Sequence, residues 1–230
     1  MRAPRSPRIH DLLVTEIFHS LQGETSLSGV RFAFIRLTGC NLRCTYCDSA
    51  YAFKGGKRMT IDEILAEIEP YNVTHVLLTG GEPLLQRPTP ELVRALKERG
   101  YQVSIETHGE VSIDQVAEHA RIVMDIKTPS SRMNRGRYVA NLPLLKREDE
   151  VKFVIASESD YFWARDLIRG GSIPTAEILL SPVVPVKNAP GTFEGVGTKW
   201  LAERILEDKL PVRMQLQLHK FIWGADQRGV

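Results

Sequence analysis

Three cysteines within eight residues are the most reactive group of side chains in this sequence. Cys40, Cys44 and Cys47 are the only cysteines, and they have a C-x3-C-x2-C spacing. An odd number of cysteines in one short cluster does not fit a disulfide framework, and it indicates a reducing compartment where such clusters bind metal or perform redox chemistry. Three thiolates this close together can each bind one iron of a cubane cluster, which leaves the fourth iron without a protein ligand.

A structural zinc ion is the main alternative for the cysteines. It needs a fourth ligand, which would have to be a histidine because the chain has no fourth cysteine. The candidate histidines, none with a knuckle-like spacing to the cysteines, are His19, His75, His108 and His219. Inert thiols are the remaining alternative. An open metal position is typical of a reactive site and absent from a purely structural one.

The cysteine segment follows a predicted strand, Arg31–Leu37, in which polar and apolar residues alternate. Strands are also predicted at Leu12–Phe18, Thr74–Thr79, Tyr101–Glu106, Ile122–Lys127, Glu150–Ile155, Glu177–Leu180 and Val212–Leu218. Helices are predicted at Thr60–Glu69, Thr89–Arg99, Ser112–His119, Ser159–Arg169 and Lys199–Glu207. The first and third helices begin with capping-box patterns, Thr60 with Glu63 and Ser112 with Gln115.

This alternation of strands and helices predicts βαβ units on a parallel sheet. With 230 residues, the chain is shorter than the roughly 250 residues typical of an eight-fold barrel. We therefore expect an α/β fold with one domain over residues 12–230, an incomplete (β/α) TIM-like barrel with about six parallel strands. A doubly wound open sheet is the alternative. Residues 1–11 are rich in arginine and proline and are expected to form a mobile arm.

Composition excludes several classes of protein. Hydrophobic residues make up 43% of the chain, charged residues 25%, and the net charge is +2, which is ordinary for a globular protein and gives no general reason to expect a nucleic-acid partner. The apolar runs, such as Val76–Leu78, are too short to span a bilayer. The N-terminus lacks the apolar core of a secretory signal. We expect a cytoplasmic protein that binds neither nucleic acid nor membrane.

Residues that could carry chemistry follow the predicted strands. These residues are Arg36–Cys47, Thr79–Pro83, Glu106–Gly109, Asp125 with Lys127, and Ser181–Val184. Because the carboxyl ends of parallel strands meet at one edge of a sheet or barrel, we expect these segments to form a single site.

Two of these motifs together resemble a known superfamily. The C-x3-C-x2-C spacing with Tyr46 before the last cysteine resembles the signature of radical S-adenosylmethionine (SAM) enzymes, and Gly80-Gly81-Glu82-Pro83 resembles their second signature. Glu16–Glu24 and Arg36–Ser49 are similar to the 7-carboxy-7-deazaguanine synthases within that superfamily. The resemblance extends from about Glu16 to Lys220.

The resemblance implies a radical SAM partial barrel with a 4Fe-4S cluster, SAM and Mg²⁺. The implied reaction converts 6-carboxy-5,6,7,8-tetrahydropterin to 7-carboxy-7-deazaguanine and ammonia, by a ring contraction that a 5′-deoxyadenosyl radical starts, in queuosine biosynthesis. It also implies a homodimer and a flavodoxin- or ferredoxin-type reductant. Two rival functions are a glycyl-radical activase, which shares the cysteine spacing but acts on a protein, and an iron–sulfur module without turnover.

The resemblance also implies roles for individual residues. It assigns Cys40, Cys44 and Cys47 to the cluster and Ser49 to Mg²⁺. The implied substrate contacts are Leu21, Gln22, Gly23, Glu24, Arg36 and Thr79. The implied SAM contacts are Tyr46, Cys47, Asp48, Gly81, Glu82, Glu106, Asp125, Ile126, Lys127, Ser181, Pro182, Val183 and Val184.

A guanidinium at Arg36 suits a substrate carboxylate because its planar fork forms bidentate pairs; the alternative is a structural pair with an acidic residue. A hydroxyl at Ser49 is a hard oxygen donor of the kind that Mg²⁺ prefers; the alternative is a loop cap.

The sequence departs from the family pattern at three places. Thr25 stands where the family has the final glycine of Q-G-E-G, and His108 replaces the asparagine of E-T-N-G. The alternative for His108 is a solvent-facing loop histidine without a role in the site. Gln217–Lys220 resembles a family Q-T-H-K motif, but ten residues follow Lys220, whereas the terminal carboxylate of shorter members reaches the site.

Overall fold

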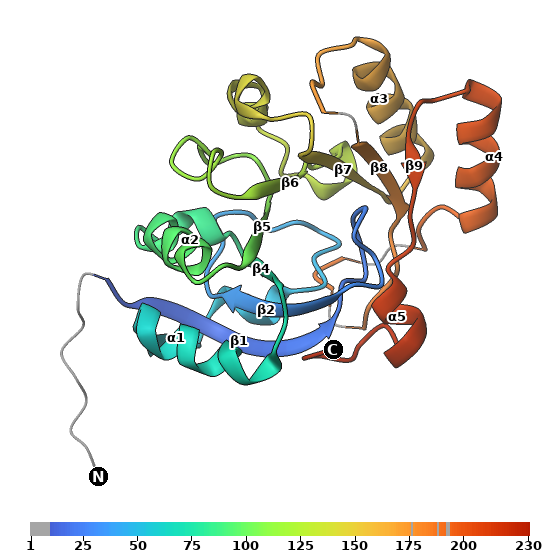
Figure 1. Cartoon of the computed structure of the whole chain (residues 1–230). Coiled ribbons are helices and arrows are strands. Elements are labelled where there is room, and N and C mark those ends of the chain that lie inside the picture. Colours follow the sequence, from blue (N-terminus) through green and yellow to red (C-terminus); the bar gives the residue numbers. More distant parts are fainter. Residues whose placement is uncertain (1–9, 176, 188, 192–193) are drawn as a thin grey trace.

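Seven parallel strands make up most of one open, curved sheet in the computed structural model (Figure 1). The structure describes residues 10–175, 177–187, 189–191 and 194–230. The strands are β1 (Leu12–Leu21), β2 (Arg31–Leu37), β3 (Lys57–Met59), β4 (His75–Gly80), β5 (Gln102–Thr107), β6 (Arg121–Asp125), β7 (Glu150–Ile155), β8 (Glu177–Pro182) and β9 (Arg213–Met214). The helices are α1 (Ile61–Ile68), α2 (Thr89–Glu98), α3 (Glu158–Arg169), α4 (Thr198–Asp208) and α5 (Leu218–Trp223).

The order of the strands confirms the predicted incomplete barrel. The sheet runs β3-β1-β2-β4-β5-β6-β7-β8-β9, and within the described residues its two edge strands, β3 and β9, do not pair. From β2 onward the strands follow chain order and are parallel. A doubly wound sheet would instead reverse its order at a switch point. β1 pairs antiparallel with both β2 and β3, so the N-terminal edge lies outside the βα pattern.

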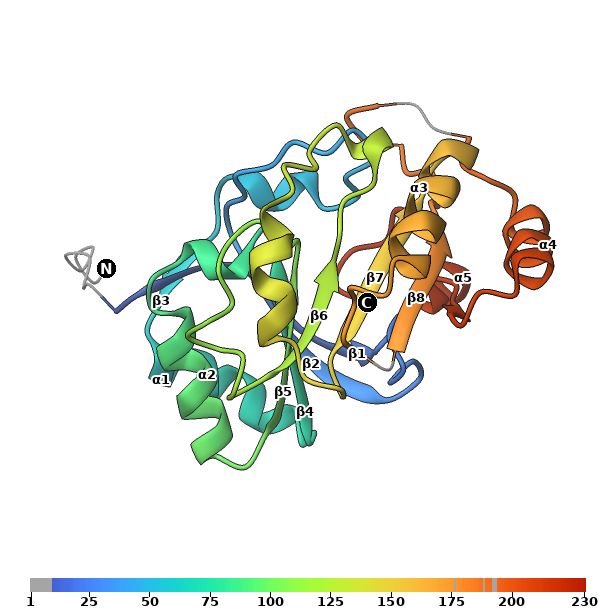
Figure 2. The same ribbon diagram turned by 90° about the horizontal axis from the view of Figure 1, so that it is seen from above.

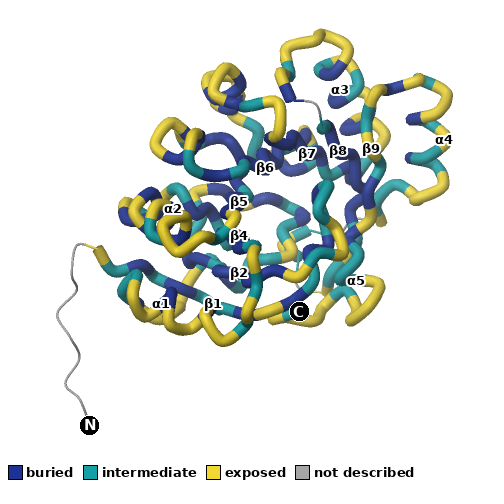
Figure 3. The backbone as a smooth tube through the Cα atoms, in the orientation of Figure 1, coloured by how far each residue is buried: buried dark blue, intermediate teal, exposed yellow. Residues whose placement is uncertain are grey.

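The two faces of the sheet differ in chemistry because side chains alternate along each strand. Helices α1 to α4 lie on the outer side of the sheet (Figure 2). The outward residues of β4 to β7 belong to the large apolar core beneath these helices, among them Leu78, Ile105, Met124 and Phe153. The helix faces turned away from the sheet are exposed, whereas the strands are buried (Figure 3). The inward face carries polar residues such as Thr79, Glu106 and Asp125 together with a few apolar ones, among them Leu77 and Val123.

Local signals explain how the first helix is placed. Thr60 and Glu63 form the predicted capping box, in which Thr60 Oγ1 accepts the backbone N–H of Glu63 at 3.1 Å and the Glu63 carboxylate accepts the backbone N–H of Thr60 at 2.9 Å. Ile64, Leu65 and Ile68 then face the sheet.

The predicted helix over Ser112–His119 is wrong. Ser112 Oγ accepts the N–H of Asp114 at 3.2 Å rather than that of Gln115, and the N–H of Ile113 donates to Asn141 Oδ1 at 3.1 Å. The segment therefore forms consecutive tight turns.

The predicted final strand Val212–Leu218 is wrong in its second half. Only Arg213–Met214 forms a ladder, with β8, and helix α5 begins at Leu218. The expected mobile arm, residues 1–11, falls on residues 1–9, which lie outside the described part of the chain, and on His10 and Asp11. His10 Nδ1 lies 2.9 Å from a carboxylate oxygen of Glu91. Within the described residues, no helix is long and apolar enough to cross a membrane.

Candidate active site

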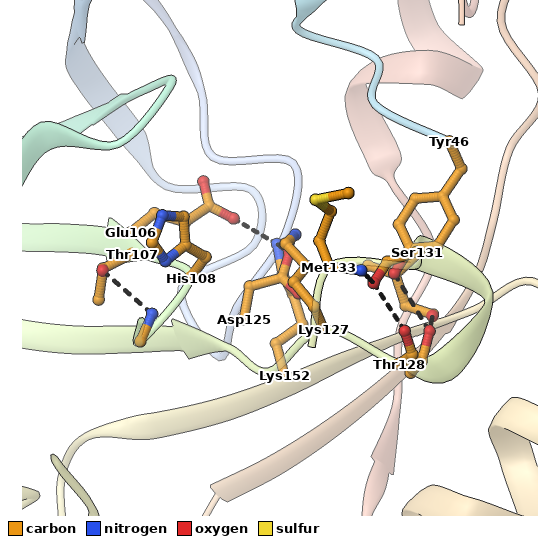
Figure 4. Close-up of polar contacts among 12 residues, drawn as sticks. Tyr46, Glu106, Thr107, His108, Asp125, Lys127, Thr128, Ser131, Met133 and Lys152 are labelled. Carbon is orange, nitrogen blue, oxygen red and sulfur yellow. Dashed lines mark hydrogen bonds and ion pairs between the residues drawn. The ribbon is translucent and has the colours of Figure 1, made fainter. Parts of the chain in front are cut away.

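The inward side chains of neighbouring strands supply the polar floor of one cavity of about 260 Å³. Arg36 of β2 and Thr79 of β4 are register partners, as are Asp125 of β6 and Lys152 of β7. Glu106 of β5 lies between these pairs on the same inner face (Figure 4). The cysteine loop, which follows β2, lies over this floor and contributes Cys40, Cys44 and Cys47 to the lining.

Most residues that the family resemblance implies are brought together here. The cavity is lined by Leu21, Gln22, Gly23, Glu24, Arg36, Cys40, Cys44, Tyr46, Cys47, Asp48, Ser49, Thr79, Gly81, Glu106, Asp125, Lys127, Val183 and Val184. The other four, Glu82, Ile126, Ser181 and Pro182, are buried and do not line it. The expectation of a single site at the carboxyl ends of the strands is thus met by residues from β2, β4, β5, β6 and β8.

The three cysteines are free thiols, and burial raises the pKa of each, that of Cys47 to about 12. Within the described residues, no three His, Cys, Asp or Glu side chains are arranged to hold a single metal ion. A cluster that takes one thiolate per iron fits this arrangement better than a zinc ion does, because tetrahedral zinc gathers its ligands around one point.

The second signature lies directly against the cysteine loop. A Cβ at Gly81 would lie 2.1 Å from the carbonyl oxygen of Gly39, so only glycine allows this contact. The N–H of Glu82 donates to the same carbonyl at 2.8 Å. The Glu82 carboxylate is fully buried and accepts hydrogen bonds from Thr107, His108 and Leu84. Its burial raises its pKa to about 7, and its contacts give it the role of holding loops together.

Asp125 is the feature of this floor that best fits a bound cofactor. Its Oδ2 lies 2.9 Å from Lys127 Nζ, whereas its Oδ1 is buried without a hydrogen-bond partner among the described residues. A buried unpaired oxygen is costly unless a ligand or water satisfies it. Opposite-charge contacts raise the pKa of Lys127 well above its usual value despite burial, so the lysine remains a cation in the cavity.

Lys152 is the principal site residue that the sequence analysis missed. Its side chain is 3% exposed, and its Nζ lies 2.8 Å from Glu24 Oε2, 3.6 Å from Asp125 Oδ2 and in contact with Glu106 Oε1 (Figure 4). A lysine in the interior of a strand flanked by Val151 and Phe153 was the available signal, because those neighbours point outward and Lys152 must point inward.

The C-terminal segment holds the loop that carries Gln22, Gly23 and Glu24. Gln217 Nε2 donates to Glu24 Oε1 at 2.9 Å, and the N–H of Leu218 donates to the carbonyl of Gly23 at 2.8 Å. A Cβ at Gly23 would lie 2.0 Å from His219 Nδ1, so this contact needs glycine. Gln22–Glu24 and Gln217–His219 therefore form one unit despite their separation in sequence.

Thr25 has a left-handed backbone, with φ of +68°. This explains the glycine of the family pattern, because glycine adopts that conformation without strain and a β-branched residue does not. The N–H of Thr25 donates to Gln215 Oε1 at 2.7 Å, and its Oγ1 accepts the N–H of Leu27 at 3.2 Å. These contacts hold the strained residue in place.

Arg36 and Ser49 each have a structural partner as well as a place in the cavity. Arg36 Nε donates to Glu16 Oε1 at 2.7 Å. Ser49 Oγ donates to Asp48 Oδ1 at 3.0 Å, and Lys220 donates to the other oxygen of that carboxylate at 2.9 Å. Attraction to Lys220 outweighs the effect of burial and holds the pKa of Asp48 well below its usual value.

The last six of the ten residues after Lys220 also reach the site. Ala225–Val230 line the cavity, and the Arg228 guanidinium lies 4.0 Å from the centre of the Tyr51 ring. The longer C-terminus is thus part of the cavity wall.

Known proteins resemble this chain over most of its length. The model of the Radical SAM superfamily matches residues 34–154. The 7-carboxy-7-deazaguanine synthase of Chlorobaculum tepidum is 44% identical over 95% of this chain and 97% of its own length, and that of Koribacter versatilis is 42% identical over 94% and 99%. The crystal structure of QueE from Escherichia coli has a TM-score of 0.67 at 22% identity and covers 89% of this chain and 94% of its own.

Proposed function

Because this chain belongs to the 7-carboxy-7-deazaguanine synthase family of radical SAM enzymes, we propose that it converts 6-carboxy-5,6,7,8-tetrahydropterin to 7-carboxy-7-deazaguanine and ammonia. The proposal adds two points to the family assignment: the identity of the substrate and the residues that bind it. It assigns substrate binding to Leu21–Glu24, Arg36 and Thr79, and SAM binding to the lining segments that follow β2, β4, β5, β6 and β8.

The position of Arg36 is the observation that most supports the proposed substrate. Its Nε is occupied by Glu16, and its two terminal nitrogens make no hydrogen bond within the described part of the chain. Its side chain is 16% exposed, and it lines the cavity that also holds the cysteines. A guanidinium fixed at Nε presents its outer fork to a planar anion, which suits the carboxylate of the pterin.

Glu24 supplies the complementary acceptor. Burial would raise its pKa, but attraction to Lys152 and hydrogen bonds from Gln217 and Lys152 hold the pKa at about 2. The carboxylate is therefore ionised at neutral pH and can accept N–H groups from the amino-pyrimidinone edge of a pterin. Arg36 and Glu24 thus recognise opposite ends of one ligand.

The cofactors add the reactive chemistry. When bound, a 4Fe-4S cluster on Cys40, Cys44 and Cys47 with SAM supplies one-electron reductive chemistry, for which we propose a flavodoxin- or ferredoxin-type donor. The chain orients the substrate and shields it from water. Lys127 and Lys152 stay protonated on Nζ and counter the negative charge of Glu24, Glu106 and Asp125.

Ser49 is the proposed protein ligand of Mg²⁺. Its hydroxyl donates to Asp48 and keeps lone pairs for a cation. We propose that substrate oxygens and water supply the rest of the shell, as is common for this ion. A homodimer and a place in queuosine biosynthesis are further parts of the proposal.

Anaerobic turnover tests the proposal. The reconstituted protein is mixed with the tetrahydropterin, SAM, Mg²⁺ and a reductant, and the deazapurine is detected by its ultraviolet absorbance and mass. Arg36→Ala should weaken pterin binding strongly while cleavage of SAM without pterin continues. Cleavage of SAM without any deazapurine would overturn the substrate assignment and favour a radical SAM activase. Absence of 5′-deoxyadenosine would favour an iron–sulfur module without turnover.

A further inference from the structure

His108, which replaces an asparagine of the family pattern, is buried between three loops of the site. Its side chain is 4% exposed, and its Nε2 lies 2.9 Å from Asn41 Oδ1 and 3.2 Å from Glu82 Oε2. Its Nδ1 accepts the N–H of Glu110 at 3.0 Å. His108 therefore connects the loop after β5 to the cysteine loop and to the second signature (Figure 4 shows its position beside Glu106 and Thr107).

These contacts fix the protonation of the ring. Because Nδ1 accepts a backbone N–H, it carries no hydrogen, and the single ring proton lies on Nε2. Nε2–H then donates to the side-chain oxygen of Asn41. A doubly protonated ring would place an N–H against the N–H of Glu110, so the geometry requires the neutral form. Burial lowers the pKa of His108 to about 3, in agreement with this geometry.

Asn41 stands next to the first cysteine. The N–H of the following residue, Leu42, points at Cys40 Sγ, with a distance of 3.4 Å between nitrogen and sulfur. Leu42 is 1% exposed, so its N–H has no access to water while the turn is in place. Hydrogen bonds to cysteine sulfur are one of the factors that set the reduction potential of an iron–sulfur cluster.

We propose that His108 is a positioning residue for the cluster: by donating from Nε2 to Asn41, it holds the turn in which the Leu42 N–H donates to Cys40 Sγ. The inference rests on the proposed function only in taking the three cysteines as cluster ligands. It does not depend on the identity of the substrate. Loss of the Nε2 donor should free Asn41 and weaken the N–H to sulfur bond, which would lower the reduction potential.

Two substitutions test the contacts of the two His108 ring nitrogens separately. Asparagine places an acceptor near the position of Nδ1 and can keep the Glu110 contact, but it is too short to reach Asn41. Glutamine extends to the position of Nε2 and can donate to Asn41. The variants are therefore His108→Asn and His108→Gln, with Asn41→Ala to remove the partner. His75→Asn is the matched control: among the described residues the His75 Nδ1 lies 2.8 Å from the adjacent Thr74 hydroxyl, the ring packs against Phe32, and the residue does not line the cavity.

The first measurement is amide hydrogen exchange at Leu42 in the cluster-free protein. We expect exchange about fivefold to tenfold faster in His108→Asn and Asn41→Ala, the size expected for loss of one hydrogen bond. Exchange in His108→Gln should be close to that of the unmodified chain. The double variant of Asn41 and His108 should be no faster than either single variant, since both remove the same contact.

The second measurement is the midpoint potential of the reconstituted cluster, followed by electron paramagnetic resonance. His108→Asn should shift it to lower potential, by about 59 mV if the ratio of reduced to oxidised cluster falls tenfold. His108→Gln should restore it. Unchanged Leu42 exchange and potential in His108→Asn would overturn the proposal, as would equal changes in His75→Asn. A protein without turnover but with these shifts would refute the proposed substrate and leave the role of His108 intact.

Discussion

Replacement of Lys152 by methionine removes the cation that three carboxylates of the cavity share. Its Nζ lies 2.8 Å from Glu24 Oε2 and 3.6 Å from Asp125 Oδ2, and it contacts Glu106. Methionine is unbranched, ends one atom short of the Lys152 Nζ and fits a position that is 3% exposed. The variant therefore tests the charge with little change in packing.

The pKa of Glu24 gives the size of the effect. Burial alone would raise the pKa of Glu24. The attraction of Lys152 and the hydrogen bonds from Gln217 and Lys152 outweigh burial and lower the pKa to about 2. A folded pKa of about 2 against the usual 4.5 corresponds to about 3 kcal/mol of stability at neutral pH. Breaking a buried ion pair by removing one partner costs about 3–5 kcal/mol. We expect Lys152→Met to lower the free energy of unfolding by about 3–5 kcal/mol at pH 7.

The sign of the pH dependence follows from the depressed pKa. The stabilisation is complete above pH 4.5 and is lost as the pH falls toward about 2, because Glu24 then takes up a proton in the folded state as well. The difference in stability between the unmodified chain and Lys152→Met should therefore narrow as the pH falls from 4.5 to 3.

Urea denaturation of the cluster-free protein at pH 7, 5 and 3 measures this difference. Lys199→Met is the control, because Lys199 is 88% exposed and pairs with Glu203 at 3.6 Å on the surface of α4; its effect should stay below about 0.5 kcal/mol. Equal stabilities of the two variants at pH 7 would refute the reasoning. So would a Lys152→Met deficit that does not change with pH.

Three further substitutions test the loops. Gly23→Ala should lower the free energy of unfolding, measured with urea, by about 1–3 kcal/mol because the added Cβ would overlap His219. Gly197→Ala, the control, has open space around it and should change this free energy little. Similar losses in the two variants would contradict the contact between Gly23 and His219. Thr25→Gly should change stability by less than about 1 kcal/mol, since relief of left-handed strain offsets the entropy of glycine, and a larger loss would mean that Thr25 is not strained. Ser49→Ala should blunt the rise of activity with Mg²⁺ while Ser49→Thr preserves it, and an equal response in both would place the ion elsewhere.

The sequence predicted the strands well because burial of one face leaves a strong period of two in the apolar residues. β4 to β7 carry apolar residues outward, and the polar residues between them, such as Thr79 and Glu106, have no place except the inner face. The same rule applies to Lys152. It was overlooked because the family motifs direct attention to segments that follow strands, and Lys152 lies inside one.

Contacts between distant segments account for what the sequence did not predict. The strand expected over Val212–Leu218 stops at Met214. The side chains of the next residues, Gln215 and Gln217, instead bind Thr25 and Glu24. The Ser112 capping box does not form because Ser112 Oγ accepts the N–H of Asp114 instead of that of Gln115, while Asn141, far along the chain, accepts the N–H of Ile113. Local propensity cannot anticipate a partner that only the tertiary fold supplies.

The C-terminal segment has a consequence for how substrate and cluster are positioned together. Gln217 and Leu218 hold the loop of Gly23 and Glu24, and Lys220 pairs with Asp48 beside the last cysteine. One short stretch of chain therefore contacts both the proposed substrate loop and the proposed cluster loop. A shift of α5 would therefore move both loops at once, and near-attack geometry is sensitive to displacements of about 1 Å.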